Sequence, residues 1–189
     1  TRFGIKLGPT MSTQRWNYFQ NGPLFKYHGD LWLESYDEND NNVVFAQLGY
    51  HLKGSATRYS TPIVFQSTTY NLSTDEFIFK NASIVLGFKK KYTKVKFNTY
   101  YGVGLRGEYT LGTNLDAYAK INELVPVYPF DDAVKKVLLG VTFSAGFDFP
   151  FSEFIGGIVE LNIAPEITRQ YYQPNIPNIV DLFQPGQTT

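Results

Sequence analysis

"KFNTYYGVGLRGEY", residues 96–109, alternates between polar and apolar residues over nearly its whole length. Counted in steps of two, one face carries Phe97, Thr99, Tyr101, Val103, Leu105 and Tyr109. The opposite face carries Lys96, Asn98, Gly102, Gly104, Arg106 and Glu108. A period of two residues indicates a β-strand. An apolar face contacts either a protein core or lipid, so the pattern is typical of both a soluble sheet and a transmembrane barrel.

Composition narrows the choice of protein class. The 189 residues contain no block of like charge, which favours a single domain spanning 1–189. The formal net charge is zero, so nucleic acid is not an expected partner. The absence of cysteine excludes disulfides and thiolate chemistry. Aromatic residues make up 17% of the chain, yet no apolar run approaches the roughly 18 residues of a membrane helix, so a membrane-spanning form would have to be a barrel.

The order of segments favours an antiparallel, up-and-down arrangement. Seven alternating segments cover roughly 2–15, 25–37, 43–57, 76–89, 94–111, 136–149 and 154–170. Short turns ("ENDNN", "KKYTK" and "PFSE") separate segments two and three, four and five, and six and seven, whereas the other connections are long. Strict alternation of short and long connections is typical of outer-membrane barrels. We therefore predict an all-β, antiparallel up-and-down transmembrane β-barrel.

Each of the seven segments has one face that is compatible with lipid, interrupted only by Lys80. The aromatic ends of these faces, Tyr27, Tyr50, Tyr109 and Phe149, fit the aromatic girdles of such barrels. A soluble sandwich whose charged face meets water remains the alternative. On the opposite faces we predict a polar network in the lumen, formed by Lys6, His28, Asp30, Glu34, His51, Lys53, Arg106, Glu108, Asp148, Glu160 and Glu166.

Seven strands do not close an ordinary bacterial barrel, because the strand number of a single chain is even. We therefore expect eight strands, of which this sequence contains seven. Residues 171–189 are rich in proline and polar residues and are predicted to be an outer loop before a last strand. Either a strand beyond Thr189 or a partner protein is expected to cover the open seam.

Only two histidines are present, and strand pairing predicts that they meet. If Tyr36 lies opposite Val43, then His28 lies opposite His51, with Asp30 and Lys53 close to them. One interpretation is a weak metal site or a His–Asp catalytic pair. The other is a hydrogen-bonded network that fills a narrow lumen. Because a third ligand and a positioned nucleophile are missing, we predict no catalytic residues and no metal site.

The two long connections after the third and fifth segments contain more apolar residues than a solvated loop requires. These residues either pack over the barrel mouth or bind a partner. The candidates are Ile63, Phe65, Tyr118, Leu124, Tyr128 and Phe130.

Four stretches resemble one known family: "RFGIKLGPTMS" (2–12), "VVFAQLGYHLKGSATR" (43–58), "YYGVGLRGEY" (100–109) and "GVTFSAGFDFPFSEFIGGIVELNIAPEI" (140–167). They are similar to the outer-membrane barrels of Bacteroidota grouped with the PorT family, and the overall plan resembles the OmpA and OmpX type. The resemblance implies an eight-stranded fold in the outer membrane of a Gram-negative bacterium and no cofactor. It also implies roles in type IX protein secretion or in larger outer-membrane assemblies.

We therefore expect a non-enzymatic outer-membrane barrel in contact with the lipid bilayer. It would act as a structural or accessory subunit of a larger assembly, such as a protein secretion or insertion machine. The alternative is a small porin or ligand-binding barrel. A barrel enzyme that uses His28 and His51 is a further alternative.

Overall fold

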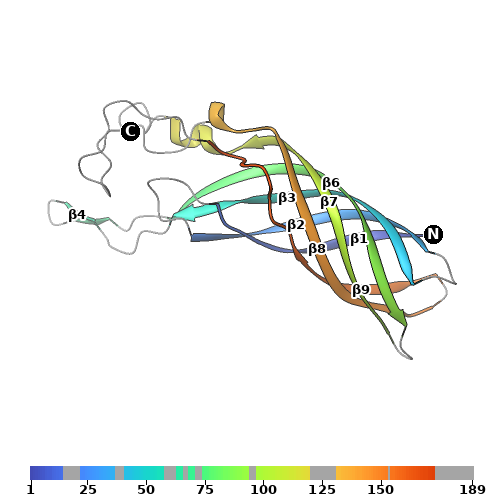
Figure 1. The fold of residues 1–189 in the computed structure, drawn as a ribbon. Coiled ribbons are helices and arrows are strands. Elements are labelled where there is room, and N and C mark those ends of the chain that lie inside the picture. The colour runs from blue at the N-terminus through green and yellow to red at the C-terminus, as the bar shows by residue number, and fades with distance from the viewer. Residues whose placement is uncertain are drawn as a thin grey trace, which may run out of the picture.

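The computed structural model describes residues 1–14, 22–36, 41–57, 63–65, 68–70, 74–93, 97–119, 131–152 and 154–172. Seven strands form one antiparallel sheet that curls into a nearly closed barrel (Figure 1). They are β1 (Arg2–Ser12), β2 (Gly22–Tyr36), β3 (Asn42–Thr57), β6 (Asp75–Thr93), β7 (Asn98–Thr113), β8 (Val137–Pro150) and β9 (Gly156–Ile163). The predicted antiparallel barrel architecture is thus confirmed. None of the helices in the described ranges is long and apolar enough to cross a membrane.

The strands form where side chains alternate between a wall and a lumen. Along β6, Ile84, Leu86 and Phe88 are exposed on the wall, while Ser83 and Val85 are buried in the lumen. This is the period of two that the sequence predicted. The predicted register of the β2–β3 hairpin is also confirmed, with His28 opposite His51.

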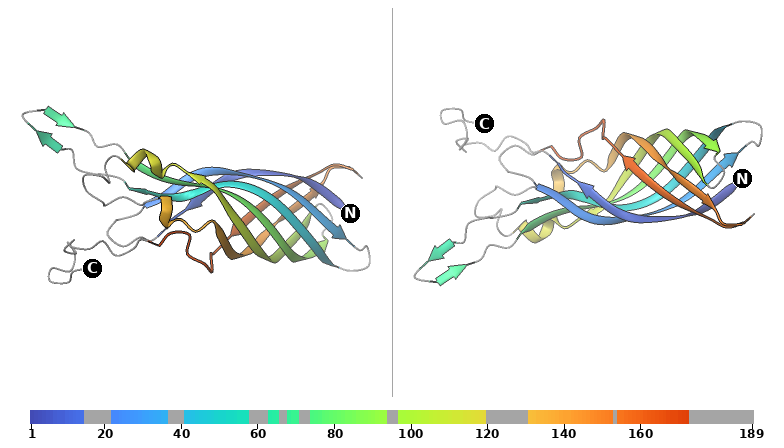
Figure 2. Two further views of the ribbon diagram at one scale, coloured as in Figure 1. Left: turned by 90° about the horizontal axis from the view of Figure 1, so that it is seen from above. Right: turned by 90° about the horizontal axis from the view of Figure 1, so that it is seen from below.

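The two edges of the sheet, β1 and β9, flank an open seam. The strand order is β1-β2-β3-β6-β7-β8-β9, with every neighbour antiparallel. An odd number of antiparallel strands makes β1 and β9 run in the same direction, which is visible from below the barrel in Figure 2. A strand antiparallel to both edges would therefore complete the pattern. We call the end where β1 begins the turn end and the opposite end the loop end.

Several segment boundaries differ from those predicted. The last segment was expected to be a strand to residue 170, but β9 ends at Ile163. Pro165 follows, and proline cannot donate to a ladder; only an isolated bridge joins Glu166 to Gly140. The turn predicted at "KKYTK" starts later, because β6 continues to Thr93. Within the second long connection, β4 (Ile63–Phe65) and β5 (Thr68–Tyr70) form a short hairpin.

The loop end of the lumen contains an apolar cluster in addition to the predicted polar side chains. Phe77 and Phe79 of β6 are fully buried there and pack on Leu115, with Tyr118 and Val134 against them. Leu115 and Tyr118 belong to the 3-10 helix η1 (Leu115–Tyr118), and Val134 follows the second, η2 (Asp131–Ala133). These helices belong to the long connection between β7 and β8, and they place its side chains over the loop end of the lumen, which is the mouth of the barrel.

Candidate functional site

A chain of alternating charges crosses the lumen near the turn end. Lys6 of β1 contacts Glu160 of β9 at 2.7 Å, and Glu160 also contacts Lys89 of β6 at 3.3 Å. Lys89 lies 4.0 Å from Glu34 of β2, which also pairs with Lys91 of β6. The chain continues from Lys91 to Asp148 at 3.3 Å and from Asp148 to Arg2 at 2.9 Å. It therefore starts and ends on β1 and connects this edge strand to β8 and β9 across the seam.

Aromatic rings surround the centre of this charge chain. The ammonium group of Lys89 lies 4.7 Å from the ring centroids of Phe45 and Tyr100, and 5.8 Å from that of Trp32. The Tyr100 hydroxyl donates a 2.6 Å hydrogen bond to Glu160. A buried ammonium is stabilised by carboxylates and by the negative faces of aromatic rings. Lys89 thus has both kinds of partner in a packed environment.

Glycines on neighbouring strands make room for the large lumen side chains. A Cβ added at Gly4 would lie 2.8 Å from the Trp32 ring, and one at Gly146 would lie 2.8 Å from the Tyr100 hydroxyl. The Phe45 ring covers Gly87 and Gly104 in the same way. Side chains therefore occupy the lumen space that these glycines leave, as in other barrels of this size.

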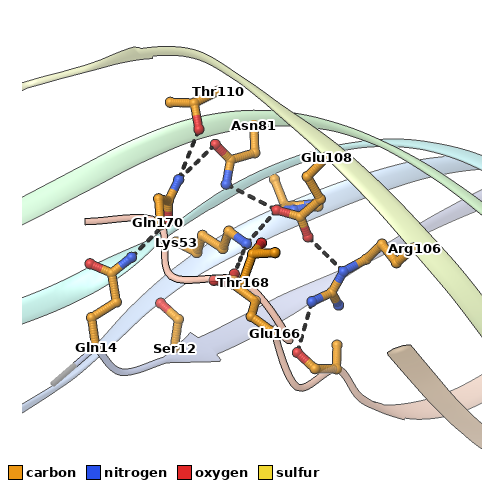
Figure 3. Close-up of polar contacts among 12 residues, drawn as sticks. Ser12, Gln14, Lys53, Asn81, Arg106, Glu108, Thr110, Glu166, Thr168 and Gln170 are labelled. Atoms are coloured by element: carbon orange, nitrogen blue, oxygen red, sulfur yellow. Dashed lines mark hydrogen bonds and ion pairs between the residues drawn. The ribbon is translucent and has the colours of Figure 1, made fainter. Parts of the chain in front are cut away.

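A second polar cluster lies toward the loop end and is centred on Glu108 (Figure 3). Its carboxylate pairs with Lys53, with Arg106 at 2.7 Å and with His51 at 3.2 Å. Lys53 also pairs with Glu166, which lies beyond the end of β9. The cluster therefore joins strands β3 and β7 to the segment that follows β9.

Gln170 anchors that segment inside the barrel. Its side-chain amide donates to Thr110 at 2.9 Å and to Asn81 at 3.2 Å, and its carbonyl oxygen accepts a 2.7 Å hydrogen bond from Gln14 (Figure 3). Asn81 in turn donates to Glu108 at 3.2 Å. This network fills the lumen between the charges of Glu108 and the apolar mouth.

The two histidines face each other in register but have separate partners. His28 forms a 2.8 Å hydrogen bond with Thr10, and its other ring nitrogen lies 3.6 Å from Asp30. This order of hydroxyl, imidazole and carboxylate resembles that of a nucleophile and its base. However, 3.6 Å is longer than a hydrogen bond, so the Asp30 carboxylate and the His28 ring are not hydrogen-bonded. His51 instead contacts Glu108, so the two rings do not form one catalytic unit.

The remaining predictions concern a metal site and the partner-binding residues, some of which lie outside the described residues. Within the described ranges, no three His, Asp or Glu side chains group as a metal site. Tyr118 packs on Phe77, with ring centroids 4.9 Å apart, and its hydroxyl donates to the Glu76 carbonyl, so it belongs to the barrel mouth. Ile63 and Phe65 lie in β4, where only the backbone is described. Leu124, Tyr128 and Phe130 lie outside the described residues.

Several residues that line the lumen were not predicted from the sequence. Lys89 and Lys91 share the face of Asn81 on β6, so continuing the period of two past residue 88 would have found them. Arg2, Trp32 and Tyr100 could have been found by the same parity on their own strands. Gln170 has the same parity as Glu160 and Glu166 in the predicted last segment, although the structure places it beyond the end of β9.

Comparisons with protein-family models, with curated proteins and with solved structures found no match to this chain.

Proposed function

We propose that this chain is a non-enzymatic β-barrel of the outer membrane of a Gram-negative bacterium, serving as a structural or accessory subunit of a larger assembly. One observation carries the proposal: an apolar wall surrounds a lumen of ion-paired side chains. Exposed apolar side chains occur on the wall of all seven strands, for example Ile5, Leu31, Leu48, Ile84, Leu105, Leu139 and Leu161. A soluble protein rarely exposes so large a continuous apolar surface.

The height of this wall supports a membrane location. On β7, the exposed rings of Tyr101 and Tyr109 lie eight residues apart. That separation is roughly 27 Å at ~3.4 Å per residue. A tilt of about 40° reduces it to roughly 20 Å along the membrane normal, close to the roughly 25 Å band of outer-membrane barrels. Tyr50 and Tyr109 both lie opposite Ala82 of β6, so they extend one aromatic belt around the barrel.

The lumen argues against the porin alternative. Charged groups span it near the turn end, and Phe77, Phe79 and Leu115 cover it at the loop end. A porin needs a continuous water path, whereas barrels of about eight strands have interiors that side chains fill. A closed lumen leaves the outer wall, the loops and the seam as the surfaces through which the barrel can act.

The seam gives the accessory role a structural basis. The facing edges of β1 and β9 lack a strand between them in the described sheet, and unpaired backbone groups are costly in lipid. A strand antiparallel to both edges, with apolar residues on its outer face, would satisfy these groups. A larger outer-membrane partner could supply such a strand, or it could bind the wall or the loops.

The test is gentle detergent extraction of the native protein from membranes, followed by mass spectrometry of intact complexes. A discrete complex with a stoichiometric outer-membrane partner supports the accessory role. A membrane-extracted monomer contradicts the accessory role but leaves the barrel in the membrane. Recovery in the soluble fraction contradicts the proposal as a whole.

A further inference from the structure

The turn between β8 and β9 exposes three large apolar side chains at the turn end of the barrel. Phe151 is 74% exposed, Phe154 is 93% exposed and Ile155 is 67% exposed. Tight turns in water are usually built from Gly, Pro, Asn, Asp and Ser. Large apolar side chains that project from such a turn indicate a binding surface.

Four backbone amides of this turn, those of Phe151, Ser152, Phe154 and Ile155, are hydrogen-bonded within the turn. The amides of Phe151 and Ser152 both donate to the Ile155 carbonyl at 2.9 Å. The Ser152 hydroxyl oxygen accepts from the amides of Phe154 at 3.3 Å and Ile155 at 3.1 Å. Unsatisfied amides are the main obstacle to placing a turn in an apolar environment. Because these four amides are hydrogen-bonded, they do not oppose the placement of the turn in an apolar environment.

The apolar surface of the turn is continuous with the wall of the barrel. Phe147 and Phe149 of β8 lie on the wall with ring centroids 6.3 Å apart, and the Phe97 ring lies 5.7 Å from the first and 6.1 Å from the second. Phe151 extends this cluster by packing over Gly157 of β9. A surface that meets lipid along the wall therefore reaches the turn without a polar break among these residues.

We infer that the β8–β9 turn lies in the interface of the membrane leaflet at the turn end and anchors the barrel to lipid. This inference rests on the proposed membrane location. The occupant is lipid, because the apolar surface is continuous with the wall. The β2–β3 connection differs, because its sequence "DENDN" at 37–41 contains three acidic residues and belongs in water.

The chain contains no cysteine, so single cysteines can be labelled with bimane at chosen positions. The full chain is reconstituted in dioleoylphosphatidylcholine vesicles as Phe154→Cys, with Phe151→Cys as a second site in the turn. Asn41→Cys is the water control at the same end, and Ile84→Cys is the control on the wall. Quenching by a doxyl-labelled phosphatidylcholine reports lipid contact, and quenching by iodide reports water.

We expect bimane at positions 154 and 151 to be quenched severalfold more by the doxyl lipid than by iodide. Bimane at position 84 should behave in the same way. At position 41, iodide should quench severalfold more than the doxyl lipid. Iodide quenching at 154 and 151 with lipid quenching at 84 overturns the inference and leaves the membrane location intact. Protection of both turn positions from both quenchers shows contact with protein and also overturns it. Iodide quenching at 84 contradicts the proposed membrane location itself, and the inference fails with it.

Discussion

Lys6 of β1 and Glu160 of β9 form a 2.7 Å ion pair across the seam, between two edge strands that do not pair through their backbones in the described sheet. Glu160 also binds Lys89, the hydroxyl of Tyr100 and the side-chain amide of Asn162, so one carboxylate serves four partners. Side chains rather than backbone ladders thus connect the two edges of the barrel at this level.

Glu160→Gln removes the charge that Lys6 and Lys89 share. The buried ammonium group of Lys89 and the partly buried one of Lys6 then lose a counterion, so we expect the free energy of unfolding to fall by about 3–5 kcal/mol. Urea unfolding in lipid vesicles measures the change. Glu76→Gln is the matched control, because its 2.7 Å pair with Lys26 is partly exposed and should contribute only about 0–1 kcal/mol. Equal effects of the two variants would contradict a structural role for the charge chain.

Gly146→Ala tests how tightly the lumen is packed. The added methyl group would lie 2.4 Å from the Val159 carbonyl and 2.8 Å from the Tyr100 hydroxyl, so β9 or Tyr100 must move. We expect a loss of about 1–3 kcal/mol in the free energy of unfolding. Gly112→Ala is the control, because nothing lies within 4 Å of its added Cβ. A neutral Gly146→Ala variant would mean that the lumen has free space.

Leu86→Arg distinguishes a membrane wall from a soluble surface. Leu86 is exposed midway along β6, so a charge there would lie near the bilayer centre. We expect it to destabilise the folded protein in vesicles by about 2–4 kcal/mol. Thr93→Arg, at the exposed end of the same strand, should be nearly neutral. If Leu86→Arg leaves the stability unchanged, the wall is exposed to water and not to lipid.

The filled lumen predicts that the purified protein does not conduct ions. Planar bilayer recordings of the full chain should show no stable single-channel steps, because Phe77 and Phe79 cover one end and paired charges span the other. Reproducible steps of constant size would favour the small-porin alternative. A general porin recorded in the same chamber controls for insertion and sensitivity.

Periodicity was sufficient to predict the strands and much of their register. The pairing of His28 with His51 followed from one turn and a period of two, because both are local properties of the chain. The end of β9 was predicted too late, because polar and apolar residues continue to alternate beyond Pro165. Proline cannot donate a backbone hydrogen bond to the neighbouring strand, so the strand ends before it.

The apolar mouth could not be predicted from periodicity. Phe77 and Phe79 share a face with Asn81, but the prediction for the lumen named only a polar network. They are buried by Leu115 and Tyr118, which lie more than thirty residues away in a connection without a periodic pattern. Contacts of this kind depend on tertiary packing and not on local preference.

The most direct test of the membrane wall is a nitroxide depth profile along β6. Single cysteines replace Ala82, Ile84, Leu86, Phe88 and Tyr92 in turn, and power-saturation spectroscopy in vesicles compares collisions with oxygen and with a water-soluble nickel complex. We predict that oxygen accessibility is highest near Leu86 and falls toward Tyr92, as expected for a strand that crosses a bilayer. High accessibility to the nickel complex at Ile84, Leu86 and Phe88 would contradict the account and place this wall in water.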